Sequence, residues 1–415
     1  MESRPTESFP ALREFLRRHL LDDIMPFWTT HAIDEAGGIN TCIRNDGTLA
    51  SRDKWLWGQW RSVWMFATLY DMIEPRREWL DIARNICDFC TRHGWDDEFG
   101  GWVLTLSADG QVITGCDSIY SDTFAIYGLV ALAKATNEQA PIDLARKTAD
   151  HLVTRLRWPH DQIPHNPFPI PSGAKVHGIA MMTSFVLWEL GELLDDDKYR
   201  RIALEQSDDI FDHFYRRDRD MLLERIAADN SEYPPPLGTT VVPGHVIEDM
   251  WFQIHIARDR GDEKRIELAC DITRRHMQIG WDDKYGGLLL AVDADGRDEV
   301  GWEFANMKIW WPHTEAMYAL LLAYEHSRAD WALQWYDRLH EYVFAHYPIA
   351  EHGEWWRNLN RDGTPMDETV SLNAPVKDPF HLPRALIYCI DVLGRLALPS
   401  DNEAARSHRR TAHDP

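Results

Sequence analysis

Two histidines lie where helices are predicted to begin, and both could transfer a proton. His245 follows Pro243 and Gly244, which end a loop. The partial positive charge of a helix N-terminus disfavours imidazolium, and a general base must be neutral. Glu248 lies three residues further on the same face and is predicted to orient the ring. The alternative is a capping histidine followed by an ordinary first-turn glutamate.

His381 lies at a second predicted helix start, because Pro383 suits the first turn of a helix. Arg384 is three residues on and faces the same way, so its guanidinium could bind a hydroxyl or a developing oxyanion. The alternative is a loop histidine beside an exposed arginine.

Tryptophans accompany these histidines. Trp310 and Trp311 lie at a loop-to-helix junction, where they could form a platform for the apolar face of a pyranose, and Glu315 could hold hydroxyls. Trp57 and Arg61 share one helix face and are expected to face an interior lumen. An inward arginine needs an anionic partner or ligand. The alternatives are core packing of the tryptophans and an interhelical salt bridge for Arg61.

Several cofactor motifs are absent from the chain. It has no HExxH, no Cys/His ligand spacing, no P-loop and no GxGxxG. We therefore predict neither a metal nor a nucleotide cofactor for the chemistry.

A glycine-containing connector that ends in a DG or DN turn recurs along the chain. Clear copies lie at 34–47, 96–110 and 282–296, weaker copies at 218–230 and 351–363, and the slot near 163 is blank. The copies fit a period of about 62 residues, which predicts six copies of one unit.

Each period contains two predicted helices. Apolar spacing places first helices at 55–74, 118–135, 179–195, 246–258, 307–325 and 383–397, and second helices at 79–92, 143–156, 200–214, 263–278 and 330–345. This favours an all-α (α/α)6 barrel, with short β-hairpin loops at one end, over an open solenoid, which would want polar capping repeats. We expect a single domain over residues 1–399 and a polar, disordered tail at 400–415.

Charge and composition limit the partners and the location. The net charge of −23 disfavours binding to nucleic acid or to an anionic membrane surface. No apolar run is long enough to span a bilayer. Six cysteines without a regular framework, and an N-terminus without a signal peptide's apolar stretch, predict a cytoplasmic protein.

Four segments in order, KWLWGQWRSVWMFATLY, GHVIEDMWF, MKIWWPHTEAMYALL and EWW–RDG followed by FHLPR, resemble the N-acylglucosamine 2-epimerase (renin-binding protein) family from about residue 11 to 395. The resemblance implies an (α/α)6 barrel with a lumenal site, a homodimer, and a small sugar as substrate. It implies that His245 and His381 are the acid/base pair. The other implied residues are Glu248 and Arg61 for catalysis, and Trp57, Met182, Trp310, Trp311, Glu315 and Arg384 for substrate binding.

Two positions and one segment separate this chain from particular branches of the family. Met182 stands where the cellobiose epimerase branch has a third histidine, and Val376 stands where disaccharide epimerases have tryptophan. The segment at 368–379 lacks the glycines that vertebrate members link to nucleotide activation. The resemblance therefore favours a monosaccharide substrate without nucleotide dependence.

The chemistry implied by the resemblance is inversion at carbon 2 of a free sugar, N-acetylglucosamine/N-acetylmannosamine or glucose/mannose. His381 is expected to remove the proton, giving an enediolate that Arg61 and Arg384 stabilise, and His245 to return a proton on the opposite face. Alternatives are an aldose–ketose isomerase, which returns the proton to carbon 1, a glycoside hydrolase, which needs a carboxylate pair, and a binding protein without catalysis.

Overall fold

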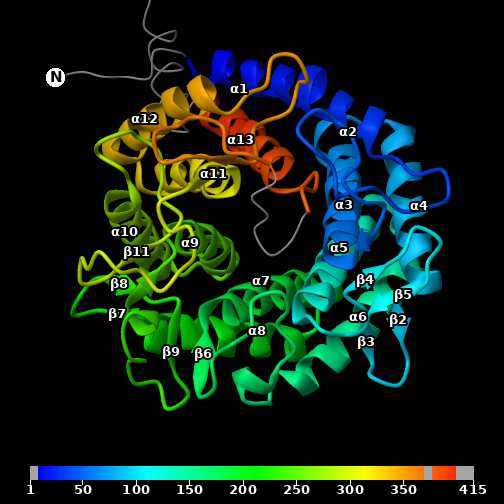
Figure 1. Ribbon diagram of the computed structural model, residues 1–415, viewed down its shortest axis with the longest axis horizontal. Coiled ribbons are helices and arrows are strands. Elements are labelled where there is room, and N and C mark those ends of the chain that lie inside the picture. Colours follow the sequence, from blue (N-terminus) through cyan, green and yellow to red (C-terminus); the bar gives the residue numbers. More distant parts are fainter. Residues whose placement is uncertain (1–7, 369–375, 399–415) are drawn as a thin grey trace, which may run out of the picture.

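The helices form a closed ring, seen face-on in Figure 1. The computed structural model describes residues 8–368 and 376–398, so the predicted tail at 400–415 lies outside the described residues. Among the described helices, none has the length and apolar composition needed to cross a bilayer.

An inner ring of helices surrounds the centre. It consists of α3 (Leu56–Thr68), α5 (Ile119–Thr136), α7 (His177–Leu194), α9 (Pro243–Asp259), α11 (Trp310–Ser327) and α13 (His381–Leu396). These helices are buried on nearly every face, because each packs on its neighbours in the ring and on a second layer outside. Their sequences are correspondingly apolar all round.

The outer layer consists of α4 (Arg77–His93), α6 (Gln139–Arg155), α8 (Asp197–Asp209), α10 (Glu263–Gly280), α12 (Asp330–His346) and α1 (Phe9–Arg18). The first five of these helices each pack on the inner helix that precedes them in the chain, and their bounds lie close to the predicted ranges. The sequence pattern gave no range for the sixth outer helix, and the structure supplies it from the N-terminus: α1 packs on α13. From α1 the chain runs through a π-helical turn (His19–Ile24) into α2 (Met25–His31).

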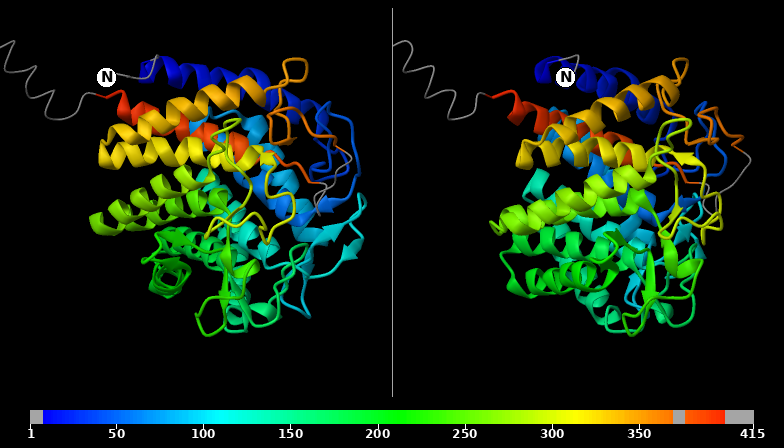
Figure 2. Two further views of the ribbon diagram at one scale, coloured as in Figure 1. Left: turned by 60° about the vertical axis from the view of Figure 1, so that its left-hand side comes forward. Right: turned by 90° about the vertical axis from the view of Figure 1, so that its left-hand side faces the viewer.

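Short strands gather at one end of the ring (Figure 2). They are β1 (Lys54–Trp55), β2 (Trp95–Asp96), β3 (Gly101–Trp102), β4 (Thr105–Leu106), β5 (Val112–Thr114), β6 (Ala174–Val176), β7 (Tyr215–Arg216), β8 (Met221–Leu222), β9 (Arg225–Ala227), β10 (Thr240–Val241), β11 (Val292–Asp293), β12 (Lys308–Ile309) and β13 (Asn358–Leu359). All the named ladders are antiparallel, with β2–β3, β4–β5 and β7–β8 as local hairpins. The predicted fold class, an all-α barrel of helix pairs with small β-hairpins at one end, is confirmed.

The remaining ladders tie each inner helix to the connector that follows its helix pair. β1 pairs with β4, β6 with β9, β10 with β11, and β12 with β13. Near residue 163, where the sequence shows no copy of the connector, a single β-bridge between Ser118 and His165 links the start of α5 to the connector that follows its helix pair. Before α13, the backbone N–H of Lys377 donates to the carbonyl of Thr41 over 2.8 Å, which joins the two ends of the ring. The starts of all these inner helices are therefore held at one end of the barrel.

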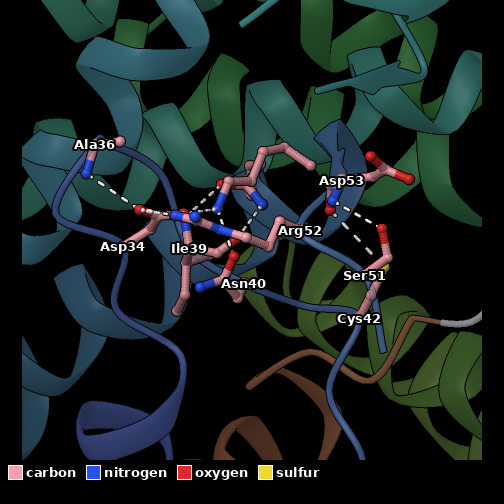
Figure 3. Close-up of polar contacts among 10 residues, drawn as sticks. Asp34, Ala36, Ile39, Asn40, Cys42, Ser51, Arg52 and Asp53 are labelled. Carbon is pink, nitrogen blue, oxygen red and sulfur yellow. Dashed lines mark hydrogen bonds and ion pairs between the residues drawn. The ribbon is translucent and has the colours of Figure 1, made fainter. Parts of the chain in front are cut away.

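The first connector is anchored by a buried lysine. Lys54 is fully buried, and its Nζ donates to Asp34 Oδ2 over 2.8 Å and to Asn40 Oδ1 over 2.7 Å. Figure 3 shows Asp34, Asn40 and Arg52 turned toward one another. Burial acts to raise the pKa of Asp34, but hydrogen bonds from Lys54 and Arg52 outweigh it and hold that pKa below its usual value.

Replacing Lys54 by alanine is expected to lower the free energy of unfolding by about 3–5 kcal/mol, because it leaves the buried Asp34 carboxylate without its interior cation. Urea unfolding measures this loss. The matched control is Arg52→Ala, which removes a cation whose side chain is 58% exposed and should cost less than about 1 kcal/mol. Equal losses in the two variants would contradict the structural role given to Lys54.

Candidate active site

A cavity of about 430 Å³ opens where the inner helices begin. Of the predicted site residues, Trp57, Arg61, Met182, His245, Glu248, Trp310, Trp311 and His381 line it. Glu315 and Arg384 do not line it; they lie behind the wall, 1% and 0% exposed. The structure thus brings side chains from α3, α7, α9, α11 and α13 to one chamber and places two predicted residues in the layer that supports it.

His381 is the first residue of α13 and is held by two buried partners. Its Nδ1 lies 2.8 Å from Glu315 Oε1 and 3.4 Å from Arg384 Nη2. A carboxylate accepts and a guanidinium only donates, so we assign the Nδ1 proton to the shorter contact, with Glu315, and this tautomer leaves Nε2 with a free lone pair. Burial, reinforced by nearby Arg61 and Arg384, lowers the pKa of His381 to about 3. This imidazole is therefore neutral at physiological pH, as a base requires.

His245 lies in the first turn of α9 beside a different carboxylate. Its Nδ1 is 3.1 Å from Glu224 Oε2. Burial acts to lower its pKa, but the charge and hydrogen bond of Glu224 outweigh burial, and the pKa of His245 is raised above its usual value. The prediction that the helix N-terminus keeps this ring neutral is wrong, because a carboxylate in direct contact is stronger than the partial charge of a helix end.

The contact between Glu224 and His245 also corrects the predicted role of Glu248. The prediction that Glu248 orients His245 is wrong, since Glu248 pairs with Arg384 instead. The backbone of Glu224 is fixed by two bonds: its N–H donates to the Thr240 carbonyl and its carbonyl accepts from the His177 N–H, each over 3.0 Å. Sequence reasoning missed it because it lies 21 residues before His245, in a weak connector copy, where a charged residue among apolar neighbours was the only signal.

A buried ion cluster supports the His381 side of the cavity. Arg384 Nη2 pairs with Glu248 Oε1 and lies 2.7 Å from Glu315 Oε1, while Trp251 Nε1 donates to Glu315 Oε2 over 2.9 Å. Burial raises the pKa of Glu315, and Arg384 opposes that rise. Within the described residues, Glu248, Glu315 and His381 offer acceptor atoms within 4.8 Å of one another, a spacing that could hold a metal ion. The cation that lies among them is the Arg384 guanidinium.

Arg61 enters the cavity from α3 with a partner. Its Nη1 lies 3.0 Å from Asp378 Oδ2, and its guanidinium carbon lies 4.0 Å above the Phe124 ring. The side chain is 19% exposed. Asp378 is thus the anionic partner that an inward arginine needs.

One indole contacts both imidazoles. The Trp311 ring stacks on His245 with 5.0 Å between centroids and lies tilted against His381 at 5.7 Å. Trp310 meets His381 edge-on at 6.3 Å. The two histidines, far apart in the chain, therefore lie in one cavity against the same side chain.

Other lining residues were not singled out from the sequence. They include Tyr120, His165, Glu224, Arg225, Trp302, Arg357 and Asp378. Val376 lies on the wall as well, so the position where disaccharide epimerases have tryptophan faces this cavity. Most of the new residues come from connectors, which sequence periodicity places only roughly.

Comparison with known proteins agrees with this geometry. The sequence profile of the family described as N-acylglucosamine 2-epimerase (GlcNAc 2-epimerase) matches residues 37–383. The chain is 33% identical over 388 residues to the N-acylglucosamine 2-epimerase of Mus musculus, covering 91% of this chain and 90% of that protein. Among solved structures, it is similar to a sugar epimerase from a ruminal bacterium (TM-score 0.80, 22% identity, 94% and 100% covered). It is also similar to a D-mannose isomerase (TM-score 0.77, 19% identity, 95% and 100% covered).

Proposed function

Because the chain belongs to the N-acylglucosamine 2-epimerase family and is a carbohydrate epimerase, an enzyme of the isomerase class, we propose that His381 and His245 invert carbon 2 of a free monosaccharide. The N-acetylglucosamine/N-acetylmannosamine pair is the first substrate proposed, since the mouse relative carries that activity in its name; glucose/mannose is the second. The observation that carries the proposal is two imidazoles in one cavity with oppositely shifted pKa values.

The reaction begins with the open-chain sugar, whose aldehyde acidifies the proton on carbon 2. His381 Nε2 removes that proton, and the electron pair moves into an enolate of carbons 1 and 2, which is an enediolate when carbon 2 bears a hydroxyl. His245, whose protonated form the Glu224 carboxylate favours, then gives its proton to the opposite face of carbon 2. The pair ends with its single proton on His381, and the reverse reaction uses the same path with the two roles exchanged.

Stabilising the enediolate needs more than two histidines. General acid–base catalysis supplies about 10²–10⁴-fold, so electrostatic stabilisation of the developing oxyanion must supply much of the rest. Arg61 is the cation proposed for this role because it lines the cavity. Arg384 acts indirectly, by holding Glu248 at the cavity wall and Glu315 against His381.

The pKa of His245 sets the expected pH dependence. The proton donor is lost as the pH rises through the raised pKa of His245, so kcat/KM should fall on the alkaline side. The forward and the reverse epimerisation should show the same alkaline fall in kcat/KM, because the equilibrium between two neutral epimers does not depend on pH. Glu224→Gln removes the charge that raises this pKa and should shift the limb to lower pH. Glu232→Gln, a change at an exposed ion pair, should leave it in place. An unmoved limb in Glu224→Gln would exclude Glu224 as the partner that sets the proton on His245.

A panel of free sugars in D₂O tests the function itself. We expect deuterium at carbon 2 of the epimer formed, read by NMR, for at least one of the two sugar pairs. Formation of a ketose with deuterium at carbon 1 would instead indicate the aldose–ketose isomerase alternative, which the likeness to a D-mannose isomerase keeps in view. Absence of exchange in every sugar would refute the proposal.

The setting of the enzyme is part of the same proposal. We propose a cytoplasmic homodimer in which residues 1–399 form one domain. The described cysteines are all free, which suits a reducing compartment. Light scattering of the purified protein measures the assembly, and a monomer at micromolar concentration would contradict the dimer.

A further inference from the structure

The cavity has a flank that proton transfer does not use. Arg225, the first residue of β9, and Trp302, on the connector before α11, both line it. The Arg225 guanidinium carbon lies 5.1 Å from the centroid of the Trp302 ring. Trp302 in turn meets His245 edge-on, with 6.3 Å between centroids. A guanidinium and an indole therefore stand side by side next to the proton donor.

Both groups are fixed in place by their backbones. Arg225 pairs with Val176 in the β6–β9 ladder. Gly301, which precedes Trp302, packs so tightly that an added Cβ would lie 2.7 Å from Thr240 Oγ1 and 2.8 Å from the Pro236 carbonyl oxygen. Arg225 Nη1 donates to the Gly301 carbonyl over a long 3.4 Å, which links the two segments. The flank is thus preformed.

The Arg225 guanidinium keeps donors available for a ligand. Within the described part of the chain it forms no ion pair, in contrast to Arg61 and Arg384, which are both paired with carboxylates. Its side chain is partly exposed and lines the cavity, and the single bond to Gly301 uses one of five N–H groups. The chain has a net charge of −23, and yet this arginine, which lies beside the reacting groups, has no carboxylate partner among the described residues. Its free N–H donors are therefore available to an acceptor atom of a ligand.

The position of this flank indicates which part of the substrate meets it. In the enolate formed when the carbon 2 proton is removed, the substituent on carbon 2 lies in the plane between the two histidines, and it projects from the same carbon that His245 protonates. A hydroxyl on carbon 2 offers one polar atom and no apolar surface, so it cannot use an indole and a guanidinium together. An acylamino group extends further and presents a carbonyl oxygen, which accepts hydrogen bonds, and an apolar methyl, which packs on an aromatic ring.

We propose that Arg225 and Trp302 form the subsite for an acylamino substituent on carbon 2, with Arg225 donating to the acyl oxygen and Trp302 contacting the methyl group. This inference rests on the proposed function. Two carboxylates on the same wall, Glu224 and Glu303, disfavour an anionic substituent in this position, so a neutral acceptor fits better than a carboxylate or a phosphate. The enzyme would then select 2-acylamino sugars over 2-hydroxy sugars.

Arg225→Met tests the subsite, because methionine keeps the apolar stem against Trp302 and removes the donors. With N-acetylmannosamine as substrate, kcat/KM should fall by about tenfold to a hundredfold, the range for a lost hydrogen bond to a charged donor. With mannose it should stay within about twofold, since mannose has no acyl oxygen. Arg219→Met, which removes an arginine paired with Asp295 outside the cavity, should change neither value.

The outcomes separate this inference from the function on which it rests. Equal losses on both sugars in Arg225→Met would overturn the subsite and assign Arg225 to the ring or to His245; no loss on either sugar would also overturn it. If the unaltered enzyme exchanges carbon 2 of mannose but not of N-acetylmannosamine, the proposed function stands and the subsite fails. If it exchanges neither, the proposed function itself fails.

Discussion

Replacing His381 by alanine is expected to lower kcat for epimerisation by about 10²–10⁴-fold, because the variant loses one of the two proposed proton-transfer groups. The structure gives this residue a neutral ring whose Nδ1 contacts Glu315, so Nε2 is the ring atom left for the substrate. NMR of the two epimers in D₂O measures the effect.

The variant should show a distinctive half-reaction. With His245 intact, the epimer whose carbon 2 proton faces that ring can still exchange for deuterium, but it returns the deuteron to the same face and does not invert. The other epimer should not exchange. His245→Ala is the matched control and should show the mirror pattern, with exchange confined to the opposite epimer.

These patterns separate a two-base mechanism from its competitors. Exchange of both epimers in either variant would mean that one base serves both faces, and near-normal turnover in both variants would end the assignment. Loss of folded structure would mimic loss of activity, so each variant is first compared with the parent by urea unfolding.

Replacing Arg384 by methionine is expected to destabilise the protein by about 3–5 kcal/mol, because two buried carboxylates, Glu248 and Glu315, lose their common cation. Methionine fills much of the same volume, so the loss reflects charge more than a cavity. Urea unfolding at neutral pH measures the free energy, and activity should fall as well, since Glu315 holds His381.

Two further variants define the origin of that loss. Arg395→Met removes an arginine that is 39% exposed and paired with Glu325, and it should cost less than about 1 kcal/mol. Arg384→Met combined with Glu248→Gln should recover part of the stability, because one of the unpaired charges is gone. A loss in Arg384→Met no larger than that of Arg395→Met would show that the cluster is not held by this charge.

The barrel could be predicted from the sequence because each helix and each connector has a local sequence pattern, and these patterns repeat along the chain. Apolar spacing marked the inner helices to within a few residues of their observed bounds; for example, 118–135 was predicted and Ile119–Thr136 is observed. The connector period then implied closure. The pattern did not show that α1 completes the ring, because that pairing joins segments at opposite ends of the chain and leaves no periodic trace.

The site was predictable in its residue types and less so in its pairings. His245, His381, Arg61 and the tryptophans were expected to meet, and they line one cavity. Which carboxylate serves which histidine could not be read from spacing, because Glu224 and Glu315 reach their partners across separate helices and connectors. The opposite pKa shifts of the two imidazoles follow from those tertiary contacts and could not be predicted without them.

The closing of the ring has a consequence for how the enzyme matures. His381 begins α13, the helix that pairs with α1, and Lys377, four residues before the start of that helix, bonds to the first connector. Under the proposed roles, a chain interrupted between residues 245 and 381 carries the proton donor without the base, and its N-terminal helix lacks α13, the helix on which it packs. We therefore expect catalytic competence only once α13 has closed the ring, and incomplete translation products should be inactive toward sugars.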